Sequence, residues 1–335
     1  MRTLAFYLAL CLILGGGPSG ASAQTVALKT VTMLLPGQVG PGTDFMWLGV
    51  DEGIFKRHGI DLQIDTPASV AGASAVALLD PGKYDVGYLS SLTLLKARQD
   101  DHSQLVQFYG LLQSNPSCFL VHKSANMKSL ADLKGKRIVL ASSSNNSTLL
   151  AQLAKHGVTP DTSTIEYAAT AAQFGAFTQG TADAIATSAY SNQPNLRLAQ
   201  HIDTTAFCQT DDGFNYQFAG LAANASYLAA NGDLIRALVA AIGETFAAAK
   251  ANPRATGESM ARHFPNLAPP VDVAMSSIQA MVPFFSTPNT RGFPPGKMSA
   301  IDWNATKQMA VKYFDLNPDF DISMAWTNAA FDKGK

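Results

Sequence analysis

DEGIFKRHGIDLQI, residues 51–64, is the stretch of sequence that decides the fold. Gly59 interrupts it, and the alternation of apolar and polar residues over 60–64 is typical of a strand with one buried face. Another strand is predicted before it, at 26–35, and between the two a helix begins at Thr43 or Asp44 and runs to Phe55. The stretch therefore completes a strand–helix–strand unit, the building block of a parallel sheet.

The same alternation continues along the chain. Further strands are expected at 85–89, 137–141, 165–167, 184–186 and 216–222, with helices at 70–79, 147–156 and 171–177. Strands that alternate with helices imply parallel sheets joined by right-handed crossovers. After residue 222 the apolar spacing is almost entirely helical, so we predict an α/β fold with a helical C-terminal part.

Residues 1–23 have the three parts of a secretory signal peptide. Arg2 supplies the positive start, 4–14 is an apolar run, and Ala21-Ser22-Ala23 resembles a cleavage site. The alternative is a membrane anchor, but a spanning helix needs roughly 20 apolar residues, more than this run provides. We therefore expect cleavage after residue 23 and a periplasmic location.

The composition argues against several classes of protein. The 335 residues carry a formal net charge of only −1, so there is no electrostatic basis for binding nucleic acid or an anionic membrane. Hydrophobic residues make up 47% of the chain, enough for large cores, which excludes a disordered protein. A chain of this length is expected to form two domains.

Two cysteines remain once the signal peptide, with Cys11, is removed. Cys118 and Cys208 are then the one pair that can form a bridge, and an oxidising compartment favours one. Two buried free thiols are the alternative.

The motifs of common enzymes and metal sites are missing from the sequence. It has no G-x-S-x-G, H-E-x-x-H or Walker-type loop, and its six histidines are scattered without ligand-like spacing. There is no C-x-x-C, which argues against zinc. Asp211-Asp212 is interpreted as a solvated turn rather than a calcium site or an acid/base pair. We therefore predict no catalytic residue, no metal and no cofactor.

Residues 51–62 resemble the stretch k-G-y-F-k-k-e-G-l-d-v near the start of a known family. These are the solute-binding proteins of nitrate, sulfonate and taurine ABC importers, grouped with the pyrimidine-precursor (NMT1/THI5-like) binders. Four more stretches resemble the family in the same order: GKYDVG at 82–87, LADLKGKRI at 130–138, HGVTPD at 156–161 and GTADA at 180–184. The pyrimidine subgroup carries D-W-x-P-N after its first strand, whereas this chain has Leu35-Pro36-Gly37-Gln38.

The resemblance implies a two-lobed type II periplasmic binding protein fold with two hinge crossovers. Residues 24–120 and 216–335 would form one lobe, and residues 121–215 the other. The crossover strands, near Phe119–Val121 and Tyr216–Leu221, would form the hinge, with Cys118 and Cys208 close to it.

The ligand is expected at the carboxyl ends of the strands, where open α/β sheets bind small molecules. The strongest candidates, Ser142, Ser144 and Asn145, follow the strand 137–141 in a polar loop; a solvated loop that only caps the next helix is the alternative. Phe45 is either a ring over the ligand or ordinary core. The loops that follow these strand ends contain no arginine, which favours a neutral or aromatic solute. The complete set of candidate ligand-binding residues is Gln38, Thr43, Phe45, Trp47, Ser90, Ser91, Ser142, Ser144, Asn145 and Tyr190.

We therefore predict a monomeric periplasmic solute-binding protein that delivers a small organic solute, aromatic, heterocyclic or sulfonate-like, to an ABC permease in the inner membrane. A sensor of the same fold that feeds a signalling partner is the first alternative. A secreted enzyme is the second.

Overall fold

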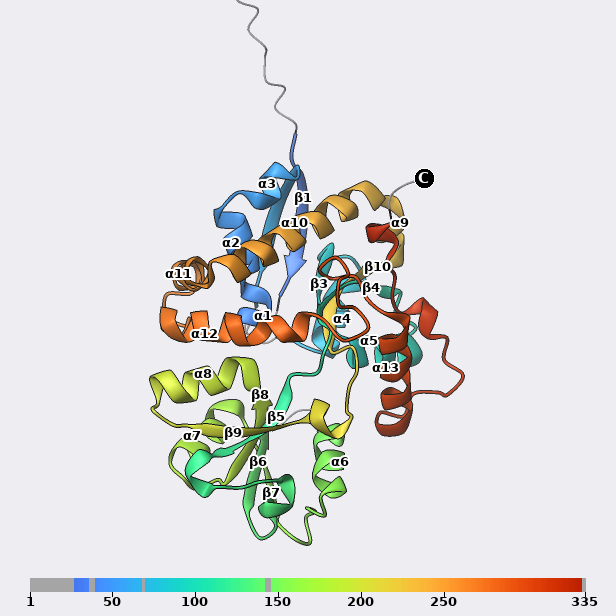
Figure 1. Cartoon of the computed structure of the whole chain (residues 1–335). Coiled ribbons are helices and arrows are strands. Elements are labelled where there is room, and N and C mark those ends of the chain that lie inside the picture. Colours follow the sequence, from blue (N-terminus) through green and yellow to red (C-terminus); the bar gives the residue numbers. More distant parts are fainter. Residues whose placement is uncertain (1–26, 36–39, 68–69, 142–145, 333–335) are drawn as a thin grey trace, which may run out of the picture.

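The computed structural model describes residues 27–35, 40–67, 70–141 and 146–332. Two five-stranded sheets, each covered by helices, form two lobes stacked one on the other (Figure 1). We call residues 27–112 with 219–332 the first lobe and residues 117–208 the second lobe. Across the described ranges, no helix combines the length and the apolar character that crossing a membrane requires.

The first sheet has the strand order β2-β1-β3-β10-β4. β1 runs parallel to β2 and β3, whereas β10 runs antiparallel to β3 and β4. β10 therefore brings a distant part of the chain back into the sheet. The strands are β1 (Lys29–Leu34), β2 (Ile60–Asp65), β3 (Val86–Ser90), β4 (Leu105–Leu112) and β10 (Ala219–Asn224).

The second sheet repeats this plan with the order β7-β6-β8-β5-β9. β6 runs parallel to β7 and β8, whereas β5 runs antiparallel to β8 and β9. Each lobe thus contains the predicted parallel strands and one strand that pairs antiparallel with its neighbours. This strand is β10 in the first lobe and β5 in the second, and each follows a segment in which the chain passes from one lobe to the other. The strands are β5 (Ser117–His122), β6 (Arg137–Ala141), β7 (Thr164–Ala168), β8 (Ala184–Ser188) and β9 (Thr204–Cys208).

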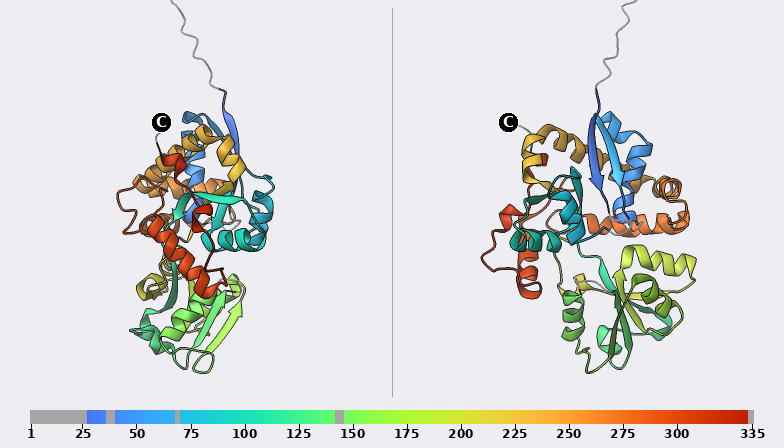
Figure 2. Two further views of the ribbon diagram at one scale, coloured as in Figure 1. Left: turned by 90° about the vertical axis from the view of Figure 1, so that its right-hand side faces the viewer. Right: turned by 180° about the vertical axis from the view of Figure 1, so that it is seen from behind.

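The helices cover both faces of each sheet (Figures 1 and 2). In the first lobe they pack around two cores, one containing Phe45 and Phe246 and the other containing Trp303. The first-lobe helices are α1 (Pro41–Asp44), α2 (Met46–Asp51), α3 (Ile54–Arg57), α4 (Ala73–Leu79), α5 (Ser91–Asp100), α9 (Ala225–Ala230), α10 (Gly232–Ala251), α11 (Pro253–His263), α12 (Val271–Met281) and α13 (Ala300–Tyr313). The second-lobe helices are α6 (Ser147–Lys155), α7 (Thr170–Thr178) and α8 (Ala189–Ala199).

The single helix predicted from Thr43 or Asp44 to Phe55 is three short helices. α1 begins earlier, with Pro41 in its first turn, and Gly53 separates α2 from α3. Gly53 has a φ of 66°, a left-handed conformation that glycine adopts without steric cost and that ends a helix. A capping box at Ser129 and Asp132 opens the short 3₁₀ helix that precedes β6.

The chain crosses between the lobes at 113–116 and 209–218. The two crossings are joined by Asn115, whose buried side-chain amide donates hydrogen bonds to the Gln209 side chain and to the Phe214 carbonyl. The expected boundary between residues 120 and 121 falls inside β5, which pairs along its length with the second sheet. Cys118 and Cys208, directly paired on β5 and β9, form the predicted disulfide.

The lobes also touch where α8 lies along α12 (Figures 1 and 2). The Ser277 hydroxyl of α12 donates to the Ser191 carbonyl of α8 at 3.4 Å, and Arg197 donates to the Ser276 hydroxyl at 3.4 Å. The Tyr190 ring lies 5.8 Å from the Phe284 ring, centroid to centroid. The space between the lobes is therefore bounded by the crossings on one side and by this helix pair on another.

Candidate functional site

A cavity of about 1080 Å³ lies between the two lobes. The first lobe contributes the ends of β1 and β3 and the start of α1, and the second lobe contributes the end of β8 and the starts of α6, α7 and α8. Strand ends and helix starts from both lobes therefore line this cavity, as expected for a ligand site of an open α/β fold.

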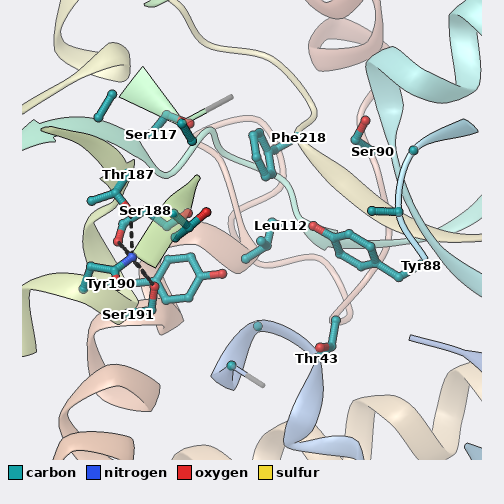
Figure 3. Close-up of a pocket in the computed structure, with 18 of the residues that line it drawn as sticks. Thr43, Tyr88, Ser90, Leu112, Ser117, Thr187, Ser188, Tyr190, Ser191 and Phe218 are labelled. Atoms are coloured by element: carbon teal, nitrogen blue, oxygen red, sulfur yellow. Dashed lines mark hydrogen bonds between the residues drawn. The ribbon is translucent and has the colours of Figure 1, made fainter. Parts of the chain in front are cut away.

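A cluster of hydroxyl and amide groups forms the second-lobe wall. Asn192, on the first turn of α8, donates from its side-chain nitrogen to Thr187 Oγ1 at 2.6 Å, to Ser191 Oγ at 3.2 Å and to the Ser188 carbonyl at 3.3 Å (Figure 3). The amide thus holds the Thr187 and Ser191 hydroxyls in fixed positions at the cavity wall. The cluster forms because β8 ends directly at the start of α8, which places the side chains of both at one corner.

Two tyrosines reach into the cavity from opposite lobes. Figure 3 shows the rings of Tyr88, from β3, and Tyr190, from α8, pointing toward each other, with Leu112 and Phe218 between them. Burial raises the pKa of both phenols far above the ordinary value, helped by Tyr190 in the case of Tyr88 and by Asp44 in the case of Tyr190. Both stay protonated and retain a hydroxyl donor, for which the described residues supply no hydrogen-bond acceptor.

The first-lobe wall includes a helix start whose cap is already formed. Ser90 Oγ accepts from the Thr93 N–H at 3.1 Å and donates to Thr93 Oγ1 at 2.8 Å. This is the usual role of a serine at a helix N-cap. Ser90 and Thr93 both line the cavity, and they are hydrogen-bonded to each other.

Asp44 lies directly behind the wall formed by Gly40 and Thr43. Its carboxylate is fully buried and accepts from the Gly40 N–H at 2.6 Å and from Thr43 Oγ1 at 3.3 Å. Burial raises the pKa of Asp44 from 3.8 to about 7, although these two hydrogen bonds oppose the rise. A carboxyl group thus underlies the wall without lining the cavity.

A family model described as NMT1/THI5 like matches residues 44–256, which is more than half of the chain and includes most of both walls. The chain belongs to the NMT1/THI5-like family. No curated protein shows significant sequence similarity to it.

Several solved structures are similar in fold to this chain. The periplasmic aliphatic sulphonate binding protein SsuA from Escherichia coli has a TM-score of 0.68 and 21% identity, over 89% of this chain and 92% of that one. The alkanesulfonate-binding protein SsuA from Xanthomonas axonopodis pv. citri, bound to MOPS, has a TM-score of 0.63 and 18% identity, over 89% and 98%. The periplasmic nitrate-binding protein NrtA from Synechocystis PCC 6803 has a TM-score of 0.62 and 10% identity, over 91% and 87%. The predicted two-lobed periplasmic binding protein fold is confirmed.

Three of the predicted site residues line the cavity of this NMT1/THI5-like protein, namely Thr43, Ser90 and Tyr190. They come from both lobes, so the structure brings them to one space. Gln38, Ser142, Ser144 and Asn145 lie outside the described residues. Asn146, which follows them, lines the cavity.

The other three predicted residues lie elsewhere. Phe45 is fully buried among Phe246 and Phe285, at 5.8 and 5.7 Å between ring centroids, which corresponds to the core alternative. Trp47 stacks on His263 at 4.1 Å, away from the cavity. Ser91 is buried and donates to Gln107 at 2.9 Å, because the residue after the N-cap turns into the core.

Several cavity residues were not predicted from the sequence, including Tyr88, Asn192 and Phe218. Tyr88 is part of a strand in which Val86, on the same face, and Leu89, on the opposite face, are both buried, so the pattern does not distinguish a ring that faces a cavity from one that faces the core. Asn192 had a usable signal, since it stands one turn after a strand end and next to Ser191. Nowhere in the described ranges do three His, Cys, Asp or Glu side chains gather closely enough to hold a metal ion.

Proposed function

We propose that this protein is the periplasmic solute-binding component of an ABC importer. The observation that carries the proposal is the cavity between the lobes, where Tyr88 and Tyr190 approach from opposite lobes and keep hydroxyl donors for which the described residues offer no acceptor. A solute between them would contact both lobes at once, and so would favour the closed arrangement over an open one.

The remaining steps of the proposal rest on the sequence of residues 1–23 and on the family to which the chain belongs. Residues 1–23 direct export and are cleaved, and the mature protein acts as a monomer in the periplasm. It captures a small organic solute, and the closed form docks on an inner-membrane ABC permease. No catalytic step is assigned, because the described lining residues offer serine, threonine and tyrosine hydroxyls but no histidine, cysteine, lysine or carboxylate to activate one of them.

The first test is native mass spectrometry of the protein purified from its own periplasm, followed by a thermal-shift screen. The screen covers sulfonates, nitrate, aromatic acids, pyrimidines and larger heterocycles. We expect a stoichiometric bound mass, or one compound class that raises the melting temperature by several degrees, because a ligand that binds only the folded state stabilises it. A bound compound that is converted to a product would instead support a secreted enzyme.

A matched pair of variants then assigns the binding to the cavity. Asn192→Ala removes the amide that positions Thr187 and Ser191, and we expect it to weaken binding roughly tenfold. Gln200→Ala removes an exposed amide just after the same helix and should leave the affinity unchanged. Equal affinities of the two variants would place the solute elsewhere.

A further inference from the structure

The described part of the cavity wall is polar but carries no ionic side chain. None of its described lining residues is an aspartate, glutamate, lysine, arginine or histidine. The stretches 36–39, 68–69 and 142–145, which adjoin lining residues in the sequence and lie outside the described residues, read PGQV, AS and SSSN and contain no charged residue. A charged solute would therefore meet no counter-charge from these side chains, and no ion pair would offset the cost of removing water from it.

Two backbone donors of the first-lobe wall are already engaged. The Gly40 N–H is bonded to the Asp44 carboxylate, and the Thr93 N–H is bonded to Ser90. Asp44 also places a carboxyl group, buried and free of any ion pair within the described chain, directly behind Gly40 and Thr43. An anion against this wall would meet a carboxyl group rather than a cation.

The two walls differ in polarity. The first-lobe wall is mainly apolar and aromatic, with Leu34, Leu35, Leu89, Leu112, Tyr88 and Phe218. The second-lobe wall is mainly hydroxyl and amide, with Ser117, Thr187, Ser188, Ser191, Asn192 and Asn195. A solute that matches both walls has an apolar ring or chain on one side and hydrogen-bonding groups on the other.

We infer, building on the proposed function, that the solute is an uncharged molecule with an apolar ring or chain and several hydrogen-bonding groups, and that the cavity discriminates against sulfonates, nitrate and other anions. The sulfonate- and nitrate-binding proteins named above share the fold at 21% identity or less. The wall chemistry of this chain sets its ligand class apart from theirs.

The test uses a metabolite extract of the host, separated by ion exchange into anionic, cationic and neutral fractions, together with ethanesulfonate and nitrate at 1 mM. Each is added to the mature protein, freed of ligand by unfolding and refolding with the disulfide intact, and the melting temperature is measured. We expect the neutral fraction to raise it by several degrees and the anions to have no effect. The shift should disappear in Asn192→Ala and persist in Gln200→Ala.

The outcomes separate the inference from the proposed function. A shift caused by the anionic or cationic fraction, by ethanesulfonate or by nitrate, and lost in Asn192→Ala, would overturn the uncharged-solute inference while supporting a solute-binding protein. A refolded protein that no fraction stabilises would count against the proposed function, and the inference would fall with it. A shift that persists in Asn192→Ala would place binding outside the cavity and overturn both.

Discussion

The Asp44 carboxyl group makes the stability of this protein depend on pH around neutrality. Burial raises its pKa in the folded state to about 7, whereas in the unfolded chain it titrates near 3.8. Between these values the folded protein holds the proton more tightly, so this contribution to stability is complete below about pH 4 and is lost as the pH rises through 7. Asn at this position cannot ionise but keeps an acceptor for the Gly40 N–H.

We therefore predict that Asp44→Asn becomes progressively more stable than the parent protein as the pH rises. The difference in free energy of unfolding should grow by roughly 1 kcal/mol per pH unit between pH 4 and 7 and level off above that. Denaturant titrations at several pH values measure it. A difference that does not vary with pH would show that Asp44 is not protonated in the folded protein.

Single residues mark the limit of what could be predicted from the sequence. Ser90 was listed as a ligand-binding candidate; it lines the cavity and also caps α5, because it stands at the junction of strand and helix. Phe45 was placed at the ligand, yet it faces the core; in helices as short as α1 and α2, a shift of one residue rotates a side chain by about 100°. The position of Trp47 depends on His263, more than 200 residues away, which no local pattern reveals.

At the scale of elements, α1 and α8 approach each other across the cavity at Gly42. A Cβ atom on Gly42 would lie 2.7 Å from the Tyr190 hydroxyl oxygen but 3.6 Å from the ring carbon that bears it. We predict that Gly42→Ala weakens solute binding several-fold, because the added methyl group pushes Tyr190 and its lobe outward. Isothermal titration with the solute identified by mass spectrometry measures this.

A double-mutant cycle isolates the cause. Adding Tyr190→Phe removes the oxygen that clashes, so Gly42→Ala should cost less affinity in that background than in the parent protein. Gly175→Ala on α7 is the control, since nothing lies within 4 Å of its added Cβ, and it should leave binding unchanged. Equal costs in both backgrounds would mean that the hydroxyl contact does not control closure.

Helices and strands could be predicted where the apolar residues repeat at a regular spacing along the chain. β2, β6 and α6 lie close to their expected ranges, since their apolar spacing reflects one buried face. β4 was not expected. Nearly all of its residues are buried, which removes the alternation, and its partner β10 lies more than 100 residues further along the chain.

At the scale of the whole molecule, the disulfide and the two crossings form one structural unit. Pro116 leads into β5 and Gln209 follows β9, so both crossings enter the second lobe beside the Cys118–Cys208 bridge, and Asn115 joins them on the other side. The bridge was expected because two cysteines remain after the signal peptide and an oxidising compartment favours their pairing. Their place inside the second sheet did not, because the register of β5 against β9 is a long-range property.

We predict that replacing both cysteines by alanine separates stability from binding. The bridge closes a loop of 90 residues, so its loss should lower the free energy of unfolding by roughly 3–4 kcal/mol. Affinity should fall only a few-fold, because β5 and β9 remain paired over five registered positions and Asn115 still joins the crossings. Denaturant unfolding and isothermal titration measure the two quantities. A large loss of affinity at unchanged stability would reverse this assignment and make the bridge a determinant of the hinge geometry.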